Sequence, residues 1–577
     1  MRERLEEHLR RAVRRLLDDA GDMGEIPPFG VETSRQAEHG DFACNAAMVL
    51  AKRLRRPPLE IAERLIESLG DANGLVGRAE IAGPGFVNLW LSGDRWREVV
   101  RQILSSGEEF GSSRTGKGRR VQVEFVSANP TGPLSIGHGR QAALGDSIAR
   151  VLLDAGYDVT REYYFNDGGR QMRVLGDSVR ARYLEQLGRA ASPPEEILEN
   201  SDAPWPEAID GLPLVFPRDG YRGDYIGEIA AALREHYGET LADEPGEGRF
   251  RQEAEARIFE EIRSTLESLG IRFDVYYNER SLYEEGKIEE TLADLRSEQL
   301  LFDADGAVWL RGTPLGLERD RVLVKRTGEP TYLLPDIAYH REKLRRGFDA
   351  VVDVMGADHI DQFPFVRQAI RALGYDPERV ELVMHQFVTL TSGGQTVKQS
   401  TRAGNFVTVD ELLEEVGADV FRFFMIQRKP ESHLDFDLDL AKETDWTKNP
   451  AYYLQYAHAR THGIEREAAR RGVPLPAVGE IDIAPLVLPE EIELIKKLSE
   501  FPEVTLRAAE TREPHHITYY LRELAALWNP YIQDGKRHRV LSEDGALTSA
   551  RLGLTLAVRT VLAKGLGLLG MSAPERM

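Results

Sequence analysis

The sequence predicts a multidomain α/β protein whose central part is built on a parallel sheet. Three observations support this fold class. A chain of 577 residues is too long for a single core and suggests roughly three to four domains. From residue 121 onward, apolar strands alternate with helices, and this order indicates parallel strands joined by right-handed crossovers. After Asp439 the hydrophobic pattern is helical throughout, which predicts an all-helical C-terminal domain.

The composition excludes several classes of protein. Hydrophobic residues make up 42% of the chain with charges interspersed, and no run of about 18 apolar residues occurs. The first helix is charged and amphipathic, unlike the apolar centre of a signal peptide. Cys44 is the only cysteine, which excludes disulfides within the chain and cysteine-rich zinc sites. We therefore expect a cytoplasmic protein with no membrane span and no protein-bound structural metal.

The net charge of −21 is unevenly distributed. Residues 184–320 contain 32 acidic and 14 basic side chains, a net charge of −18, so the other 440 residues carry only −3. Basic clusters occur outside this segment, at 10–15, 52–56, 114–120 and 536–539. A single cluster is usually a solvated face, whereas several on one surface would indicate a nucleic-acid partner.

Residues 1 to about 110 are predicted to form an α+β domain. After the first helix, the pattern of residues 41–54 is helical, and two prolines separate it from a further helix at 59–69. Residues 79–91 alternate like paired strands around a Gly-Pro-Gly turn. The glycine- and serine-rich run at 111–120 is interpreted as a linker to the next domain.

The stretch 121–146 is predicted to bind phosphate. It begins as a buried strand, breaks in a run of Ser, Asn, Pro and Gly, and continues as a helix. Gly137, His138 and Gly139 lie at the start of that helix. There the free N–H groups and the positive end of the helix attract an anion, and glycine lets the backbone approach closely. An ordinary strand-to-helix turn is the alternative for this stretch taken alone.

A second strand, at 157–165, ends in the polar run Asn166-Asp167-Gly168-Gly169. In open parallel sheets, ligands collect at the carboxyl ends of the strands. Asn129, Asn166 and Asp167 all follow strand ends, so we expect them to face one site.

Residues from about 184 to 320 are interpreted as an α/β insertion between two halves of the sheet. The sheet is expected to resume near Val322, with buried strands at 350–355 and 380–387. A polar loop follows at 391–406. A lysine, a serine and an arginine in that loop, Lys398, Ser400 and Arg402, are suited to hold phosphate oxygens and neutralise developing charge.

Two short motifs together resemble the signatures of class I aminoacyl-tRNA synthetases. Ser135-Ile136-Gly137-His138 resembles the His-x-Gly-His motif, and Lys398-Gln399-Ser400-Thr401 resembles Lys-Met-Ser-Lys. Longer stretches resemble arginyl-tRNA synthetases of the bacterial type, among them E-F-V-S-A-N-P-T-G-P-L, Y-Y-F-N-D-G-G, T-Y-L-L-P-D-I-A-Y-H and Y-Y-L-Q-Y-A-H-A-R. The similarity runs over nearly the whole chain and is weakest in the acidic segment. The first signature motif comprises Ala128, Asn129, Pro130, Thr131, Gly132, Pro133, Leu134, Ser135, Ile136, Gly137 and His138.

The resemblance implies a fold and an activity. It implies a Rossmann-type catalytic core at 119–440, a tRNA-binding N-terminal domain at 1–110 and a helical anticodon-binding domain at 441–577. The implied reaction is the ATP-dependent ligation of L-arginine to tRNA(Arg) through arginyl-adenylate. Mg²⁺ would arrive with ATP and needs no dedicated protein cage. The family is mostly monomeric, and we expect a monomer.

The resemblance also implies roles for individual residues. An arginine substrate presents a guanidinium and an α-ammonium, so its pocket needs carboxylate and amide oxygens. The matching positions are Glu124, Asn129, Tyr332, Asp336 and Gln362, and for Asp336 a helix N-cap after Pro335 is the alternative.

The expected ATP contacts are Ser135, Gly137, His138, Gly139, Gly356, Asp358, His359, His385, Gln386 and Phe387, and the last three are expected to contact the adenine edge through their backbone. The expected catalytic residues are His138, Lys398, Ser400 and Arg402, and the expected tRNA contacts are Tyr452, Gln455, Tyr456, Arg460, Trp528 and Asn529. Most aromatic side chains of the C-terminal domain are expected to lie in its core, and one or two are expected to stack on bases.

The chain departs from both signatures. Ser135 replaces the first histidine, and Gln399 and Thr401 replace the methionine and the second lysine. No lysine precedes the first motif in residues 131–134, where some relatives carry a compensating one. Losing one transition-state donor typically reduces the rate by about 10²–10³. Two hypotheses follow: a working arginyl-tRNA synthetase, or a synthetase-derived paralogue that binds tRNA or an adenylate and acts as a regulator.

Overall fold

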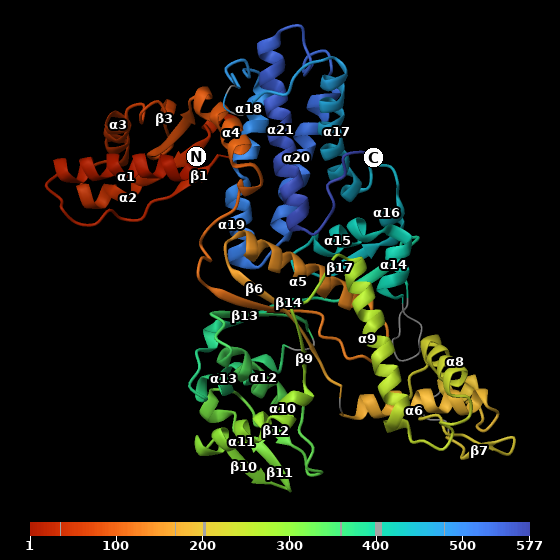
Figure 1. Ribbon diagram of the computed structural model, residues 1–577. Coiled ribbons are helices and arrows are strands. Elements are labelled where there is room, and N and C mark those ends of the chain that lie inside the picture. The colour runs from red at the N-terminus through yellow and green to blue at the C-terminus, as the bar shows by residue number, and fades with distance from the viewer. Residues whose placement is uncertain are drawn as a thin grey trace.

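The computed structural model describes residues 1–34, 36–167, 169–199, 204–357, 360–397, 407–477, 479 and 481–577. Figure 1 shows an N-terminal unit set to one side, a central part around a parallel sheet, and a long helical bundle above that sheet. Two further lobes, in yellow and in green, hang below the sheet. This multidomain α/β architecture confirms the predicted fold class.

The N-terminal unit combines three helices with a small antiparallel sheet. The helices are α1 (Arg2–Asp19), α2 (Ala46–Leu54) and α3 (Pro58–Leu69). The sheet has the order β1-β2-β4-β3, with β1 at Val31–Thr33, β2 at Phe42–Cys44, β3 at Val76–Ala82 and β4 at Phe86–Leu91. The predicted paired strands are present, but the helix predicted from residue 41 begins only at Ala46. Phe42–Cys44 instead lies between β1 and β4 as an inner strand, so tertiary pairing overrides the local helical pattern.

The central sheet has five parallel strands in the order β14-β13-β5-β6-β9. Their bounds are β5 Arg120–Glu124, β6 Asp158–Phe165, β9 Val275–Asn278, β13 Ala350–Gly356 and β14 Val380–His385. Side chains alternate between its two faces. Val352 and Val354 of β13 share a core with α5 (Ile136–Asp154), whereas Val351 shares one with α12 (Leu333–Arg345) and α13 (Phe363–Ala372). The two faces are therefore covered by helices from different halves of the chain.

The interval 184–320 contains a strand of the central sheet. β9 pairs with β6, so this interval divides into a lobe before β9 and a lobe after it. The first lobe contains α6 (Gly169–Gln186), α7 (Glu195–Glu199), β7 (Ala208–Ile209), β8 (Leu212–Pro213), α8 (Asp224–Tyr237) and α9 (Arg251–Ser268). The second contains α10 (Arg280–Glu284), α11 (Lys287–Ser297), β10 (Leu301–Ala304), β11 (Ala307–Leu310) and β12 (Arg321–Val324). Val322 belongs to the small sheet β10-β11-β12, and the central sheet resumes only at Ala350.

The C-terminal part is helical after β17 among the described residues. A connecting region leads into it through β15 (Val388–Ser392), β16 (Gln395–Thr396), α14 (Val409–Val416), α15 (Ala418–Ile426), β17 (Leu434–Asp437) and α16 (Leu438–Lys442). The bundle consists of α17 (Pro450–Arg470), α18 (Pro489–Ser499), α19 (Phe501–Thr511), α20 (His515–Gln533) and α21 (Gly545–Leu568). The helix α4 (Gly93–Ser106) packs against this bundle, where the Arg101 side chain donates to the Ile481 carbonyl at 2.9 Å.

Within the described ranges, α21 is the one helix long and apolar enough to cross a membrane by length and composition. It packs against α17 and α20, and 61% of its apolar window is buried inside the fold. Its apolar surface therefore contributes to the core of the bundle.

Candidate active site

A strained turn follows the central strand β5. Val126 and Ser127 have φ values of 68° and 43°, in the left-handed region that residues other than glycine rarely adopt. The Ser127 hydroxyl donates to Glu124 Oε1 at 2.9 Å and accepts from the Tyr164 N–H at 3.2 Å. These bonds hold the chain against β6 as it passes over the carboxyl end of the sheet. Backbone strain fixed in this way is often found at functional sites.

The residues predicted to gather at this edge do so. Asn129 Oδ1 accepts from the Asn166 N–H at 3.4 Å, and Asn129 Nδ2 donates to Gln171 Oε1 at 2.6 Å. Asp167 is 2% exposed and accepts from Asn278 Nδ2 at 2.9 Å. The ends of β5, β6 and β9 are therefore joined by side-chain amides and carboxylates.

His138 is oriented by the residue that replaces the first histidine of its motif. The Ser135 N–H donates to His138 Nδ1 at 3.2 Å, and the Ser135 hydroxyl lies at the same distance from this nitrogen. An N–H group can only donate, so Nδ1 must be the acceptor. In the neutral ring the proton consequently lies on Nε2, which is the nitrogen able to donate to an anion.

The two glycines beside His138 have different surroundings. Among the described residues, a Cβ added to Gly137 would meet only Ser135 Oγ, at 3.7 Å, so no described side chain crowds this face of α5. A Cβ on Gly139 would lie 2.5 Å from the Phe421 ring. Gly139 was predicted to contact ATP, but it is buried, and its lack of a side chain lets α5 pack against α15.

Part of the predicted ATP site lies outside the described residues. This applies to Lys398, Gln399, Ser400, Thr401 and Arg402 and also to Asp358 and His359. The chain after the polar loop is described, and there Thr408 forms a β-bridge with Ser135. The Val409 N–H also donates to the Leu134 carbonyl at 2.9 Å. The chain that follows the polar loop therefore lies directly against the first motif, more than 250 residues away in sequence.

Asp336, Gln362 and Tyr332 form a polar group on the other side of the sheet. Gln362 lies at the start of α13, and its side-chain amide donates to Asp336 Oδ2. Asp336 lies inside the first turn of α12, whose N-cap position is Tyr332, so the alternative role of Asp336 as an N-cap is excluded. The Tyr332 side chain is 67% exposed and lies one helical turn before Asp336.

Glu124 was predicted to contact the arginine substrate, but its carboxylate is engaged inside the protein. It is 4% exposed, with Oε1 bonded to Ser127 and Oε2 paired with Lys343 Nζ. Lys343 is fully buried and also pairs with Asp353 Oδ1 at 2.6 Å. Glu124 therefore supports the site as part of an ion network and has no oxygen without a partner.

The ion network extends to α12 through His340. His340 Nε2 lies 2.7 Å from Asp353 Oδ2, and Nδ1 lies 2.7 Å from the Asp336 carbonyl. Burial alone would raise the pKa of Asp353, but Lys343 and His340 hold it well below its usual range. Burial would likewise lower the pKa of Lys343, and its two carboxylates raise it instead. The helix that carries Asp336 is thus tied to β5 and β13 by charged, buried groups.

Glu279 is a site residue that the sequence analysis missed. It directly follows β9 and accepts from the Tyr164 hydroxyl at 2.6 Å. Burial raises its pKa to about 7, and the nearby carboxylates Asp336 and Asp167 act in the same direction. The strand before it, β9, has only four residues and lies in the interval that the sequence analysis interprets as an insertion. A strand end in the central sheet would have indicated Glu279.

The segment predicted to contact adenine is held by the protein's own backbone. The Gln386 N–H donates to the Pro430 carbonyl at 3.1 Å, and the Gln386 carbonyl accepts from Arg140 Nη1 at 2.7 Å. Both backbone groups of Gln386 are therefore engaged within the protein. The Phe387 side chain is 64% exposed, and Gly356 at the end of β13 pairs with His385 in the neighbouring strand.

Comparisons with known proteins agree with this geometry. Family models match residues 3–91 as "Arginyl tRNA synthetase N terminal domain", residues 99–193 and 234–430 as "tRNA synthetases class I (R), catalytic domain", and residues 454–577 as "DALR anticodon binding domain". The arginine–tRNA ligase of Desulfotalea psychrophila is 48% identical and that of Syntrophotalea carbinolica 45%, each over 100% of both chains. The chain belongs to the arginyl-tRNA synthetase family.

The solved structures show the same fold. The arginyl-tRNA synthetase of Thermus thermophilus matches with a TM-score of 0.74 and 25% identity over 100% of both chains. That of Plasmodium falciparum matches with a TM-score of 0.71 and 17% identity over 99% of each chain, a likeness of fold alone. As a class I arginyl-tRNA synthetase, the chain is a ligase that joins arginine to tRNA. The relatives give no support to the alternative of a regulatory paralogue.

Three of the residues predicted to contact tRNA are buried in the synthetase's helical bundle. Trp528 is fully buried, and its indole N–H donates to the Ala457 carbonyl at 3.1 Å. Gln455 donates to Asp419 at 2.7 Å, and Asn529 is 2% exposed. The prediction of direct RNA contacts by these three was wrong, because their helical spacing places them on the core side of α17 and α20. Tyr452, Tyr456 and Arg460 are half-buried, and their roles stay predictions.

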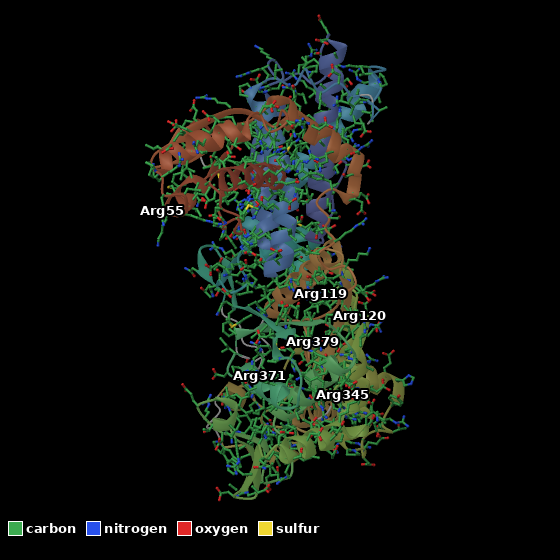
Figure 2. The ribbon with its side chains drawn as sticks, turned by 90° about the vertical axis from the view of Figure 1, so that its left-hand side faces the viewer. Arg55, Arg119, Arg120, Arg345, Arg371 and Arg379 are labelled. Atoms are coloured by element: carbon green, nitrogen blue, oxygen red, sulfur yellow. The ribbon has the colours of Figure 1, made fainter. Side chains whose placement is uncertain are left out.

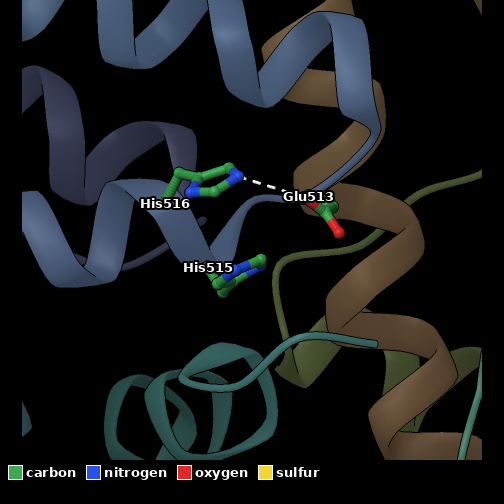
Figure 3. A group of neighbouring side chains, drawn as sticks. All are labelled: Glu513, His515 and His516. Atoms are coloured by element: carbon green, nitrogen blue, oxygen red, sulfur yellow. Dashed lines mark hydrogen bonds and ion pairs between the residues drawn. The ribbon is translucent and has the colours of Figure 1, made fainter. Parts of the chain in front are cut away.

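A group with the spacing of metal ligands lies at the start of α20. Figure 3 shows Glu513, His515 and His516, whose potential ligand atoms lie within 4.8 Å of one another. Glu513 is already bonded to His516 at 3.0 Å and to Lys429 at 3.4 Å. The positive end of α20 and the Lys429 ammonium both oppose the binding of a cation here. We therefore interpret the group as a polar contact between α20 and the loop at Lys429.

Arginines gather on a different edge of the synthetase from the active site. Figure 2 shows Arg119, Arg120, Arg345, Arg371 and Arg379 along one side of the central part. Arg120 begins β5 and Arg379 precedes β14, so this is the amino edge of the sheet. The active site lies at the carboxyl edge. These arginines therefore do not contribute to phosphate binding there.

Proposed function

We propose that this synthetase is catalytically active and joins L-arginine to tRNA(Arg) through an arginyl-adenylate. The observation that carries the proposal is the pairing of two features at one edge of the sheet. One is the pair of neighbouring carboxylates Asp336 and Glu279, and the other is the start of α5 with His138. A cationic amino acid and an anionic nucleotide would meet between them.

Arginine would bind on the side of α12. The carboxylates of Asp336 and Glu279 suit the guanidinium, because charge-assisted bonds to a planar fork are strong and directional. The exposed ring of Tyr332 would cover that group, and the amides of Asn129 and Gln362 would bind the α-ammonium end. Glu124 acts on this pocket through Lys343 and Ser127.

ATP, carrying Mg²⁺, would bind along α5. His138 Nε2–H would donate to a phosphate oxygen, and Gly137 would let the nucleotide approach the backbone. Gly356, Asp358 and His359 would hold the ribose, and His385 to Phe387 would border the adenine. Lys398, Ser400 and Arg402 would neutralise charge as the arginine carboxylate attacks the α-phosphorus and pyrophosphate leaves. The terminal hydroxyl of tRNA then attacks the adenylate carbonyl, and AMP leaves.

The domain roles follow the predicted boundaries. Residues 1–110 would contact the outer corner of tRNA, residues 119–440 would carry the chemistry, and residues 441–577 would bind the anticodon. Tyr452, Tyr456 and Arg460 lie together on α17, where Arg460 donates to the Tyr456 hydroxyl at 2.7 Å and Trp446 stacks on Tyr456 at 3.8 Å. This aromatic group suits base stacking. The enzyme would act as a monomer in the cytoplasm.

The altered motifs are compatible with this activity. Ser135 keeps its N–H bond to His138, and a backbone N–H does not depend on the side chain at that position. Thr401 removes one positive charge, for which the nearby Arg402 would substitute.

Arginylation of total tRNA with labelled arginine tests the proposal. Purified enzyme at a thousandth of the tRNA concentration should esterify arginine over many turnovers, and omission of ATP should abolish the product. The proposal fails if no arginine is esterified even with enzyme equimolar to tRNA.

A further inference from the structure

Arg140 is a fully buried arginine on α5, two residues after His138. Its Nη1 donates to the Gln386 carbonyl at 2.7 Å, and its Nη2 donates to the Lys429 carbonyl at 3.2 Å. These carbonyls belong to two different loops, one after β14 and one after α15. The Gln386 N–H donates to Pro430, so the two loops are also bonded to each other. Arg140 thus closes a three-way junction between the start of α5 and both loops.

The surroundings of this guanidinium differ from those of a structural ion pair. Among the described residues, Arg140 forms no salt bridge, and its bonded partners are two carbonyl oxygens. Burial lowers its pKa to about 10, so it keeps its positive charge at neutral pH. A buried charge held only by carbonyls is expensive in free energy. It also orients those carbonyls strongly, since bonds from a charged donor are stronger than neutral ones.

The other large buried arginine near α5 provides a contrast. Arg422 is also fully buried, and it pairs with Asp146 at 2.6 Å. Its remaining bonds go to Leu569 and Leu269, near the end of the chain and the end of α9. Arg422 therefore joins α15 to α5 at a point eight residues beyond His138 and to two segments that carry no predicted ATP residue.

We propose that Arg140 is a positioning residue for ATP. It fixes the distance between the phosphate-binding start of α5 and the loop at Gln386 and Phe387 that borders the adenine. Without it, the loop is free to shift relative to His138, and the two ends of the nucleotide no longer fit both places at once. The inference rests on the proposed function, because it assumes that ATP lies between these two elements.

Steady-state arginylation by the full-length enzyme tests this role, with the KM values for ATP and for arginine measured separately. Arg140→Met should raise the KM for ATP about 10- to 100-fold and leave the KM for arginine within about twofold. Arg140→Lys should restore part of the loss, since an ammonium can still donate to one or both carbonyls. Arg422→Met is the matched control: it removes an equally buried arginine and should lower thermal stability without a selective change in the KM for ATP.

The outcomes separate this inference from the proposed function. If the wild-type enzyme esterifies no arginine, the proposed function fails. If the wild type is active and Arg140→Met changes both KM values equally, or neither, the proposed function stands and the positioning role is wrong. If Arg140→Met does not fold, Arg140→Lys decides, and a KM for ATP within twofold of wild type in that variant overturns the inference.

Discussion

The two ends of the active site hold their buried charges in different ways. At the arginine end, Glu124, Lys343, Asp353 and His340 are buried together, and Lys343 pairs with both carboxylates. At the ATP end, Arg140 is equally buried, and its bonding partners among the described residues are carbonyl oxygens. Under the proposed function, the carboxylates of Asp336 and Glu279 would face the cationic substrate at the arginine end. At the second end, the positive charge of Arg140 would lie near the anionic nucleotide. The comparison shows two ways of holding buried charge, by opposite charges at one end and by backbone carbonyls at the other.

The largest expected effect is on the network at the arginine end. Lys343→Met removes the cation shared by two buried carboxylates, and breaking a buried pair in this way should lower the free energy of unfolding by about 3–5 kcal/mol. Denaturant-induced unfolding measures this loss. Lys442→Met, which breaks an exposed pair with Glu415, is the control and should change stability little. A loss for Lys343→Met no larger than that of the control would show that the network contributes no net stability.

A second test concerns the carboxylate charge of Asp336 in the proposed arginine site. Asp336→Asn keeps an oxygen that can accept from Gln362 but removes the carboxylate charge. Losing a hydrogen bond to a charged group should weaken arginine binding by about 1.5–3 kcal/mol, roughly a 10- to 100-fold rise in the KM for arginine. Asp303→Asn, on an exposed pair with Arg296, serves as the control. An unchanged KM for arginine would remove Asp336 from the guanidinium site.

Most of the fold was predictable from sequence, because apolar strands and amphipathic helices repeat with the periods of the elements they form. The four strands predicted at 121–126, 157–165, 350–355 and 380–387 lie within two residues of β5, β6, β13 and β14. β9 was missed because it is only four residues long and its pairing with β6 is set by tertiary structure. The same reason explains the misplaced helix start before Ala46.

The site was less predictable than the fold. Local motifs predicted that Asn129, Asn166 and Asp167 lie together at the strand ends, which the structure confirms, whereas the role of His138 stays a prediction. They could not show that Glu124 has both oxygens engaged, because Lys343 lies 219 residues away in sequence. Local motifs also could not show that Trp528 is buried, because helical spacing alone does not say which face of α20 is covered. For Glu124 and for Trp528, the outcome depends on contacts between residues far apart in the sequence.

A third prediction uses the pH dependence of the pocket. The pKa of Glu279 is raised to about 7 by burial, so this carboxyl group is neutral below that pH and charged above it. The guanidinium is positively charged at every pH in this range. The value of kcat/KM for arginine should therefore rise with pH and level off above about 7, with the midpoint reporting the free enzyme. Glu279→Gln should lower the plateau and remove this step; a step that persists in the variant belongs to another group.

The smallest expected effect is that of Ser135. Ser135→Ala keeps the backbone N–H that orients His138 and removes only the hydroxyl. We expect kcat for arginylation to fall less than about tenfold, well below the 10²–10³ typical of a lost transition-state donor. A loss of a hundredfold or more would mean that the hydroxyl itself contacts the reacting phosphate.

The independence of the two ends is tested most directly by a double-mutant cycle on Arg140→Met and Asp336→Asn, with kcat/KM for arginylation measured at limiting ATP and limiting arginine. The two residues share no hydrogen-bond partner among the described residues. We therefore predict that their effects on the activation free energy add to within about 0.5 kcal/mol. A coupling above about 1 kcal/mol would contradict the account, because it would mean that the two ends form a single charged unit.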